Sequence, residues 1–184
     1  MSLEKFKFFK VLMFFLENTY REAYLRELAR LLKLSPYTVS SNLNVLLKNN
    51  LVIKRAVANL TYFKANAKNP FYKYLKIAFN IKEISDSGLI EYILKNFTAV
   101  SSIVLYGSIA KGEDSSNSDL DLLIIGQKPK RLELNEFKEK LGRDISVLSF
   151  KWSEWKKNAK TNKAFYMEVI VDGIPLYRYL PVVK

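Results

Sequence analysis

A glycine-serine pair and two aspartates, separated by a polar loop, form the pattern in this sequence with the clearest chemical meaning. The run is LYGSIAKGEDSSNSDLDLLII, residues 105–125. Gly107-Ser108 follows one predicted apolar strand, and Asp119 and Asp121 open the next. Because alternate residues of a strand share a face, we expect both carboxylates to point the same way. The spacing therefore predicts a cluster of hard oxygen ligands.

Such a cluster suits Mg²⁺ together with the phosphates of a nucleotide. Mg²⁺ takes one or two carboxylates plus phosphate oxygens, and paired ions can clamp an in-line phosphoryl displacement. Gly107 lacks a Cβ, so backbone can approach a phosphate there, and Ser108 and the amides that follow can donate to it. Lys111 lies one turn further on, where it could neutralise an outer phosphate. A lone Gly-Ser is usually a turn and a lone Asp-x-Asp a solvated strand end, but their combination between two apolar strands favours a site.

The run Gly107-Ser108, ten residues, Asp119-x-Asp121 resembles the signature of the minimal nucleotidyltransferases, small members of the DNA polymerase β-like superfamily. The resemblance covers roughly residues 84–180 and implies a mixed β-sheet flanked by helices. It further implies that Gly107 and Ser108 bind the triphosphate and that Asp119 and Asp121 bind Mg²⁺. The expected reaction transfers a nucleoside monophosphate from a nucleoside triphosphate, for which we expect ATP, to a hydroxyl and releases pyrophosphate.

The third acid of this superfamily, which deprotonates or orients the acceptor, has no strict counterpart. The matching segment is GRDISV, residues 142–147, and it puts Ser146 at that position. Asp144 lies two residues earlier, on the same strand face, and is the candidate third catalytic carboxylate if the strand starts early enough. The alternative is a solvated strand-start acid, and both interpretations stay open. Without a third acid, nucleotide and Mg²⁺ binding could survive while transfer slows by about 10²–10⁴-fold.

Positive charge is concentrated in the first half of the chain. Residues 1–82 hold 15 Lys and Arg against 4 Asp and Glu, whereas residues 83–184 hold 15 against 14, which accounts for the net charge of +12. Lys and Arg gain affinity for nucleic acid by releasing its condensed counterions. The asymmetry therefore predicts a polyanionic partner for the first half.

Residue types absent from the chain narrow the chemistry further. With no Cys and no His, the sequence excludes disulfides, zinc fingers, Cys- or His-ligated metals and His-based nucleophilic triads. A catalytic metal must therefore have oxygen ligands. The apolar amino-terminal stretch is interrupted by Lys7 and Lys10, is too short to span a bilayer and has no cleavage pattern, so we expect a cytoplasmic protein that does not bind membranes.

Three helices and a hairpin are predicted in the first 66 residues. Ser35-Pro36 is typical of a helix start, with an N-cap residue followed by proline at the first position. The predicted helices are Leu3–Glu17, Tyr24–Leu32 and Pro36 to about Asn49, and the predicted strands are Leu51–Arg55 and Leu60–Lys64.

This order resembles a winged helix-turn-helix, although the same elements can also serve dimerisation or protein docking. The acid-poor third helix and the basic hairpin favour double-stranded DNA, with the helix in the major groove and the hairpin on the backbone. The residues expected to bind DNA are Tyr37, Thr38, Ser40, Ser41, Asn44, Lys48, Lys54, Arg55 and Lys64.

The predicted fold class is α+β, with a winged helix-turn-helix domain followed by a mixed β-sheet flanked by helices. The predicted divisions are a DNA-binding domain at 1–66, a linker helix at 67–83 and a nucleotidyltransferase domain at 84–184. Later helices are expected at Arg131–Leu141, about Lys151–Ala159 and Asn162–Val171.

Two functions of different classes fit these patterns. The first is a Mg²⁺-dependent nucleotidyltransferase delivered to its substrate by the winged helix. The second is a DNA-binding regulator or antitoxin, expected to be a homodimer, whose nucleotidyltransferase-like half binds nucleotide or a partner protein without efficient turnover. The resemblance implies partners such as a toxin nuclease. The position of Asp144 relative to Asp119 and Asp121 separates the two functions.

Overall fold

The computed structural model describes residues 6–127, 129 and 132–183. The chain divides into two compact units, Met1–Phe79 and Asn80–Lys184. This division falls inside the stretch 67–83 that was predicted as a linker helix. Each unit has its own hydrophobic core, so each is described by itself.

The first unit consists of helices and a small antiparallel sheet of strand order β1-β3-β2. The predicted helix Leu3–Glu17 begins at Lys7, and residues 3–5 of that prediction lie outside the described residues. Tyr24 was predicted to be helical but lies in a short strand, because Ala23-Tyr24 pairs with Tyr62-Phe63. The elements are α1 (Lys7–Glu17), β1 (Ala23–Tyr24), α2 (Leu25–Leu32), α3 (Pro36–Lys48), β2 (Val52–Val57) and β3 (Leu60–Ala65).

Local chemistry explains the start of α3 and the turn of the hairpin. The Ser35 hydroxyl accepts a hydrogen bond from the Thr38 backbone N–H at 3.1 Å, with Pro36 in the first turn, which confirms the predicted cap. Both strands of the hairpin extend beyond their predicted ends. They meet at a two-residue turn, Ala58-Asn59, where Ala58 takes a φ of +49°.

Helix α4 (Pro70–Ser87) contributes side chains to the core of the first unit. Tyr72 is 1% exposed and its hydroxyl donates to the backbone carbonyl of Phe15 at 2.7 Å. Lys76 is also 1% exposed and its ammonium donates to the backbone carbonyl of Leu16. Both carbonyls belong to the last turn of α1, where a helix leaves such groups unsatisfied and favours a cation. The start of α4 thus completes the packing of the first unit.

The second unit is built on a four-stranded mixed sheet of order β6-β5-β4-β7. Strands β5 and β6 are parallel, whereas β4 is antiparallel to both β5 and β7. The elements that follow α4 are α5 (Leu89–Asn96), β4 (Thr98–Tyr106), α6 (Gly107–Lys111), β5 (Leu120–Gln127), α7 (Asn135–Leu141), β6 (Ile145–Phe150), α8 (Trp152–Thr161), α9 (Lys163–Val171) and β7 (Ile174–Arg178).

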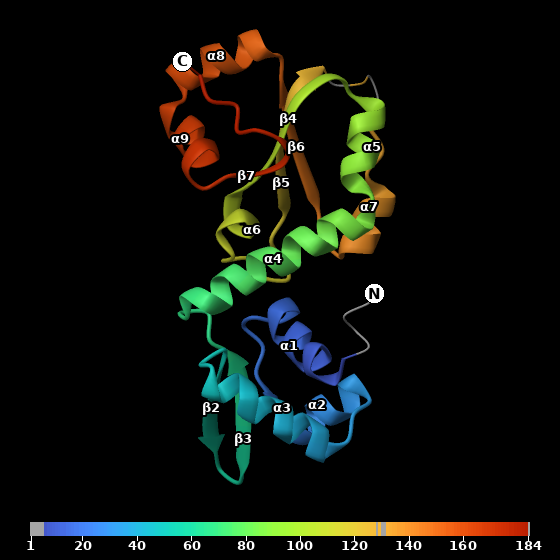
Figure 1. The fold of residues 1–184 in the computed structure, drawn as a ribbon, viewed down its shortest axis with the longest axis vertical. Helices are drawn as coiled ribbons and strands as arrows, with labels where there is room; N and C mark the ends of the chain where they lie inside the picture. Colours follow the sequence, from blue (N-terminus) through green and yellow to red (C-terminus); the bar gives the residue numbers. More distant parts are fainter. Residues whose placement is uncertain (1–5, 128, 130–131, 184) are drawn as a thin grey trace. The chain divides into compact units, whose positions relative to one another are not determined.

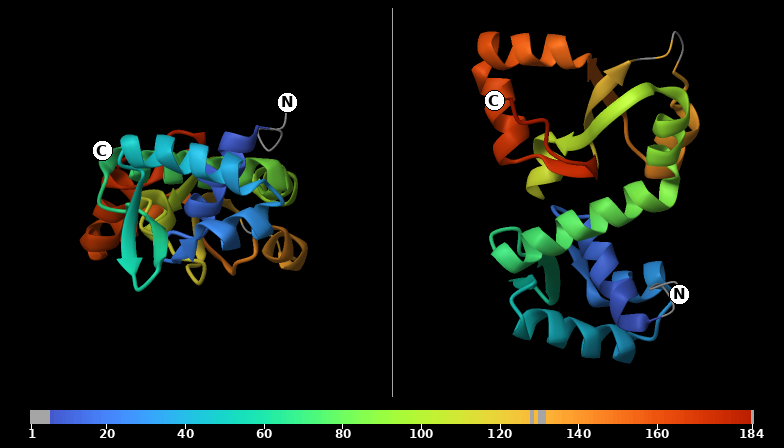
Figure 2. Two further views of the ribbon diagram at one scale, coloured as in Figure 1. Left: turned by 90° about the horizontal axis from the view of Figure 1, so that it is seen from below. Right: turned by 45° about the horizontal axis from the view of Figure 1, so that its top comes forward.

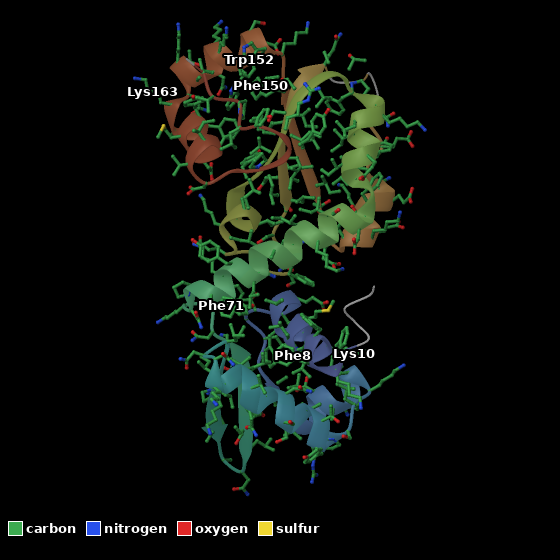
Figure 3. The ribbon with its side chains drawn as sticks, viewed as in Figure 1. Phe8, Lys10, Phe71, Phe150, Trp152 and Lys163 are labelled. Carbon is green, nitrogen blue, oxygen red and sulfur yellow. The ribbon has the colours of Figure 1, made fainter. Side chains whose placement is uncertain are left out.

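Helices cover both faces of this sheet, as Figures 1 and 2 show for α5 and α7 on one side and α8 and α9 on the other. Leu120, Leu122 and Ile124 of β5 pack with the α5 and α7 residues, whereas Leu123 and Ile125 pack with Trp155 and Val169. Figure 3 shows Phe150 and Trp152 where β6 passes into α8. The mixed sheet flanked by helices is therefore confirmed.

One predicted helix of this unit was too long. Arg131 lies outside the described residues, and residues 132–134 are not helical, so α7 begins at Asn135. Leu132 and Leu134 instead pack against the core from the irregular segment before α7, while the Glu133 backbone N–H donates to the Tyr92 hydroxyl at 3.2 Å.

None of the described helices combines the length and apolarity that a bilayer crossing requires.

Candidate functional site

The centre of the candidate site is the bend at Gly107 and its contact with Asp121. Gly107 follows the last residue of β4 and has a φ of +73°, a conformation that side-chain-bearing residues rarely adopt. A Cβ built at Gly107 would lie 2.6 Å from Oδ2 of Asp121. The register agrees, because Tyr106 at the end of β4 pairs with Asp121 at the start of β5. Only glycine leaves room for this carboxylate against the bend.

Asp119 and Asp121 interact electrostatically at the start of β5. Burial raises the pKa of Asp121, and the nearby charge of Asp119 raises the pKa further. Leu120 and Leu122 point into the core on the opposite face, where both are essentially inaccessible to solvent. Two carboxylates held near each other in partly desolvated surroundings favour a cation between them.

Ser146 is the residue on β6 that lies next to Asp121. The two are partners in the parallel register of β5 and β6. The Ser146 side chain is hydrogen-bonded to Asp121, which opposes the rise in the pKa of Asp121. The position at which the family resemblance places a third acid therefore holds a hydroxyl.

The structure does not bring Asp144 to the aspartate pair. Its carboxylate Oδ1 accepts from Lys138 Nζ at 2.7 Å, and its side chain is 70% exposed. Asp144 is also not among the charges that shift the pKa of Asp121. Across the described residues, no three acidic side chains gather into a group that could hold a metal ion.

Lys111, at the end of α6, is held by two acids of the α9 region. Its ammonium lies 3.0 Å from Oε1 of Glu168 and 3.4 Å from Oδ2 of Asp172. The hydrogen bond with Glu168 is the largest cause of a raised pKa at Lys111. Ser108 lies beside Gly107 in the first turn of α6. Lys111 is thus one turn from the bend, but it is already paired in the absence of a ligand.

Sequence reasoning missed two acidic residues of this region. Burial, the charge of Asp121 and the charge of Glu168 together raise the pKa of Tyr106 to about 12. The charge of Glu168 also contributes to the raised pKa of Asp121. Asp114 lies in the polar loop and is completely buried. Neither residue carries a periodic or spacing signal, because their partners lie far along the chain.

The residues predicted to bind DNA on α3 form a largely accessible surface of the first unit. Tyr37 is 84% exposed, and Ser41, Asn44 and Lys48 are exposed as well. Ser40 and Thr38 are half-buried, and the Thr38 hydroxyl lies 2.9 Å from the Ser35 hydroxyl in the helix cap. Five of these six side chains therefore lack a role in the cap.

The basic residues of the hairpin differ from one another in their partners. Lys54 is exposed. Arg55 Nη2 lies 2.5 Å from Oε2 of Glu22, and this hydrogen bond raises the pKa of Arg55. Lys64 Nζ lies 5.8 Å from the ring centroid of Tyr20. Lys54 and Lys64 thus present positive charge with no acidic partner among the residues that the structure describes, whereas Arg55 is paired with Glu22.

Comparison with known proteins bears on the second unit. The family model described as "Polymerase beta, Nucleotidyltransferase" matches residues 89–179. This match supports the nucleotidyltransferase superfamily for the unit that contains the candidate site.

A solved structure described as "Crystal structure of the toxin-antitoxin with AMP-PNP" is similar at 18% identity and a TM-score of 0.37, over 50% of this chain and 71% of that chain. A TM-score this low does not establish a shared fold. No curated protein sequence matches the chain significantly.

Proposed function

We propose that the second unit is a Mg²⁺-dependent nucleotidyltransferase that moves a nucleoside monophosphate from a nucleoside triphosphate, ATP in this proposal, to a hydroxyl acceptor. The observation that carries the proposal is the fit of the Asp121 carboxylate against Gly107, where a Cβ would lie 2.6 Å from Oδ2. This fit puts a carboxylate directly beside the bend at which phosphates are expected. The match of residues 89–179 to the nucleotidyltransferase model supports the same reaction class.

The residues present fit Mg²⁺. Asp119 and Asp121 are hard oxygen donors, and the raised pKa of Asp121 reflects burial and repulsion that a bound cation would relieve. Two carboxylates leave positions for phosphate oxygens and water, which is the usual environment of protein-bound Mg²⁺. When bound, Mg²⁺ would neutralise charge on the phosphates during the displacement.

The chain's own residues supply binding and orientation. The bend at Gly107 exposes backbone to the phosphates, and Ser108 can donate its hydroxyl to them. Lys111 offers a cation one turn away, anchored by Glu168. Ser146 donates to Asp121 and so helps to keep this carboxylate ionised and oriented. These groups bind and orient the nucleotide, but they provide no obvious base for the acceptor.

The alternative function is a regulator or antitoxin whose second unit binds nucleotide or a partner protein, such as a toxin nuclease, without efficient turnover. The serine opposite Asp121 and the pairing of Asp144 with Lys138 favour this alternative. Loss of general-base assistance typically costs about 10²–10⁴-fold in rate. The two functions therefore share a nucleotide site and differ in turnover.

We also propose that the first unit is a winged helix-turn-helix that binds double-stranded DNA, as a homodimer. Its support is the exposed, acid-free surface of α3 beside the hairpin, together with the excess of positive charge in residues 1–82. Short polar side chains on α3 can meet base edges, and hairpin cations can meet phosphates.

The nucleotide site is tested with α-labelled ATP, Mg²⁺ and a lysate, in wild type and in Asp119→Asn combined with Asp121→Asn. We expect label transfer in wild type and none in the double variant. Glu136→Gln, which breaks an exposed pair with Lys140, is the matched control and should transfer normally. Equal transfer by the double variant would remove the catalytic assignment. Mg²⁺-dependent nucleotide binding by wild type without transfer would select the regulator instead.

DNA binding is tested by titrating duplex DNA at several salt concentrations. Lys54→Glu should weaken binding and lower the slope of log affinity against log salt by about 1 for the lost phosphate contact. Lys156→Glu, on α8 of the second unit, is the charge-matched control. Identical isotherms for wild type and Lys54→Glu would contradict the proposed hairpin contact. Analytical ultracentrifugation would test the homodimer.

A further inference from the structure

The loop between α6 and β5, residues 112–119, carries Asp119 and is held by hydrogen bonds along its length. The Glu113 backbone N–H donates to the Ser108 carbonyl at 3.0 Å at the start of the loop. In the middle, the Ser115 backbone N–H donates to the Ser118 hydroxyl at 2.9 Å. Loops of eight polar residues are usually solvated, so this degree of internal bonding indicates a fixed conformation.

Asp114 is the buried anchor of this loop. Its side chain is 0% exposed, and each of its carboxylate oxygens has its own partner. Asn80 Nδ2 donates to Oδ1 at 2.8 Å, and Arg143 Nη1 donates to Oδ2 at 3.3 Å. A buried carboxylate is strongly unfavourable unless it is paired and hydrogen-bonded. The three side chains therefore fix the loop to α4 on one side and to the segment that leads into β6 on the other.

The residue after Arg143 also holds the end of this loop, through a backbone hydrogen bond. The Leu120 backbone N–H, directly after Asp119, donates to the Asp144 carbonyl at 2.8 Å. Two adjacent residues directly before β6 thus hold the loop near its start, at Asp114, and at its end, next to Asp119. Asp119 lies between these two points, and Ser146 further along β6 bonds to Asp121.

We propose that Asp114 is a positioning residue, which acts through Arg143 to fix Asp119 beside Asp121. This inference rests on the proposed nucleotide site and extends it to residues outside the Gly-Ser and Asp-x-Asp run. The competing explanation is that Asp114 stabilises the whole unit without any particular effect on Asp119. The two explanations differ in where flexibility appears when the Asp114 bonds are lost.

The experiment measures hydrogen exchange of the full-length protein without ligand. Asp114→Asn keeps the side chain's shape but turns one acceptor oxygen into a donor group and removes the charge, so the paired arrangement must be rebuilt. Asp114→Ala removes the bonds to Asn80 and Arg143 and is the stronger variant, whereas Asp114→Asn serves if the alanine variant does not fold. Glu136→Gln is the control for the loss of an acidic pair on the surface.

We expect exchange of the Ser118 and Leu120 amides to rise by about tenfold in Asp114→Asn, which corresponds to one lost charge-assisted hydrogen bond. Amides in the interior of β5, residues 122–124, should keep their wild-type exchange. A uniform rise across the second unit, or no rise at 118–120, would overturn the positioning role. This readout requires neither nucleotide nor turnover.

Binding of the Mg²⁺ complex of a non-hydrolysable ATP analogue, measured by calorimetry, gives the functional readout. The folded Asp114→Asn protein should bind with roughly tenfold lower affinity, as is typical when outer partners of metal ligands are lost. Wild-type affinity in a variant whose loop exchange has risen would also overturn the role. If wild type itself binds no Mg²⁺-nucleotide complex, the proposed function fails, and the exchange experiment still decides whether Asp114 fixes the loop.

Discussion

Adding one methyl group at Gly107 is the most selective perturbation of the proposed site. In Gly107→Ala the new Cβ would lie 2.6 Å from Asp121 Oδ2, whereas ordinary contact begins at 3.4 Å. The carboxylate oxygen must therefore move by about 0.8 Å or rotate away. Asp121 Oδ2 is the end of a flexible side chain, so we expect the side chain rather than the backbone to give way.

The cost in stability has two parts that a matched variant can separate. An alanine in the left-handed region costs roughly 1–2 kcal/mol. A displaced Asp121 side chain adds about 0.5–1.5 kcal/mol for an off-rotamer conformation. Gly88 has a φ of +78°, and a Cβ there would meet no other part of the protein within 4 Å, so Gly88→Ala reports the backbone part alone. The excess for Gly107→Ala should therefore stay at or below about 1.5 kcal/mol.

The cost in function should be larger. A misplacement of about 1 Å in a catalytic arrangement can cost 10²-fold, so Gly107→Ala should lose about two orders of magnitude in Mg²⁺-dependent nucleotide affinity or transfer. Gly88→Ala should bind like wild type. In an Asp121→Asn background, the methyl group should have little further effect on Mg²⁺ binding, because the carboxylate that it displaces has already been neutralised.

Denaturant unfolding gives the stability terms, and calorimetry with a non-hydrolysable ATP analogue gives the affinities. The reasoning would be refuted if Gly107→Ala bound the Mg²⁺-nucleotide complex as tightly as Gly88→Ala. It would also be refuted if Gly107→Ala were destabilised by several kcal/mol more than Gly88→Ala, since the strain would then lie in the backbone.

Three further perturbations test the charge balance and the domain division. Burial and the charge of Asp119 raise the pKa of Asp121, so ionisation of this carboxyl destabilises the folded state at a pH above that pKa. This cost fades as the pH falls towards the ordinary aspartate pKa of about 4. In EDTA, Asp121→Asn should therefore raise the melting temperature more at about pH 7 than at about pH 4. Equal shifts at both pH values would contradict this. Ser146→Asp adds an acid opposite Asp121 and should tighten Mg²⁺ binding in titrations. It should also speed label transfer by up to about 10²-fold if the missing base limits turnover. Unchanged Mg²⁺ affinity would argue against the pairing of residue 146 with Asp121. In denaturant unfolding, a fragment of residues 1–66 should be less stable than a fragment of residues 1–87 by at least about 3 kcal/mol, because it lacks the buried Tyr72 of α4. Equal stability of the two fragments would show that α4 is dispensable for the first unit.

The core of the site could be predicted from sequence because its signals are local. Strand alternation places Leu120 and Leu122 in the core, and the structure confirms their burial. A glycine at the bend could be expected because a residue without a Cβ allows close approach of the backbone, but the fit of Asp121 against it could not. The parallel partner of Asp121 could be expected as Ser146 from the register of the matching segment, and the structure has this pairing.

Other features could not be predicted because they depend on contacts between distant residues. Lys111 is paired with Glu168, 57 residues later, and no sequence pattern links the two. Asp114 has the composition of a solvated loop residue, yet Asn80 and Arg143 bury it from both sides. Leu132 and Leu134 were predicted to lie in a helix, but they pack against the core from an irregular segment before α7.

The local costs of the Gly107–Asp121 bend argue against a purely structural turn. A structural turn could place its acids in water, but here burial and Asp119 raise the pKa of Asp121, and the backbone at Gly107 takes a φ that only glycine adopts easily. The burial and repulsion of Asp121 disfavour the folded state without a ligand, and a cation bound to phosphate would relieve this electrostatic cost, whereas glycine adopts the bend without strain. Such costs concentrate where a protein binds or reacts, because elsewhere substitutions that remove them are stabilising. A serine opposite Asp121 fits the same logic, since a hydroxyl supports the carboxylate without adding a third negative charge.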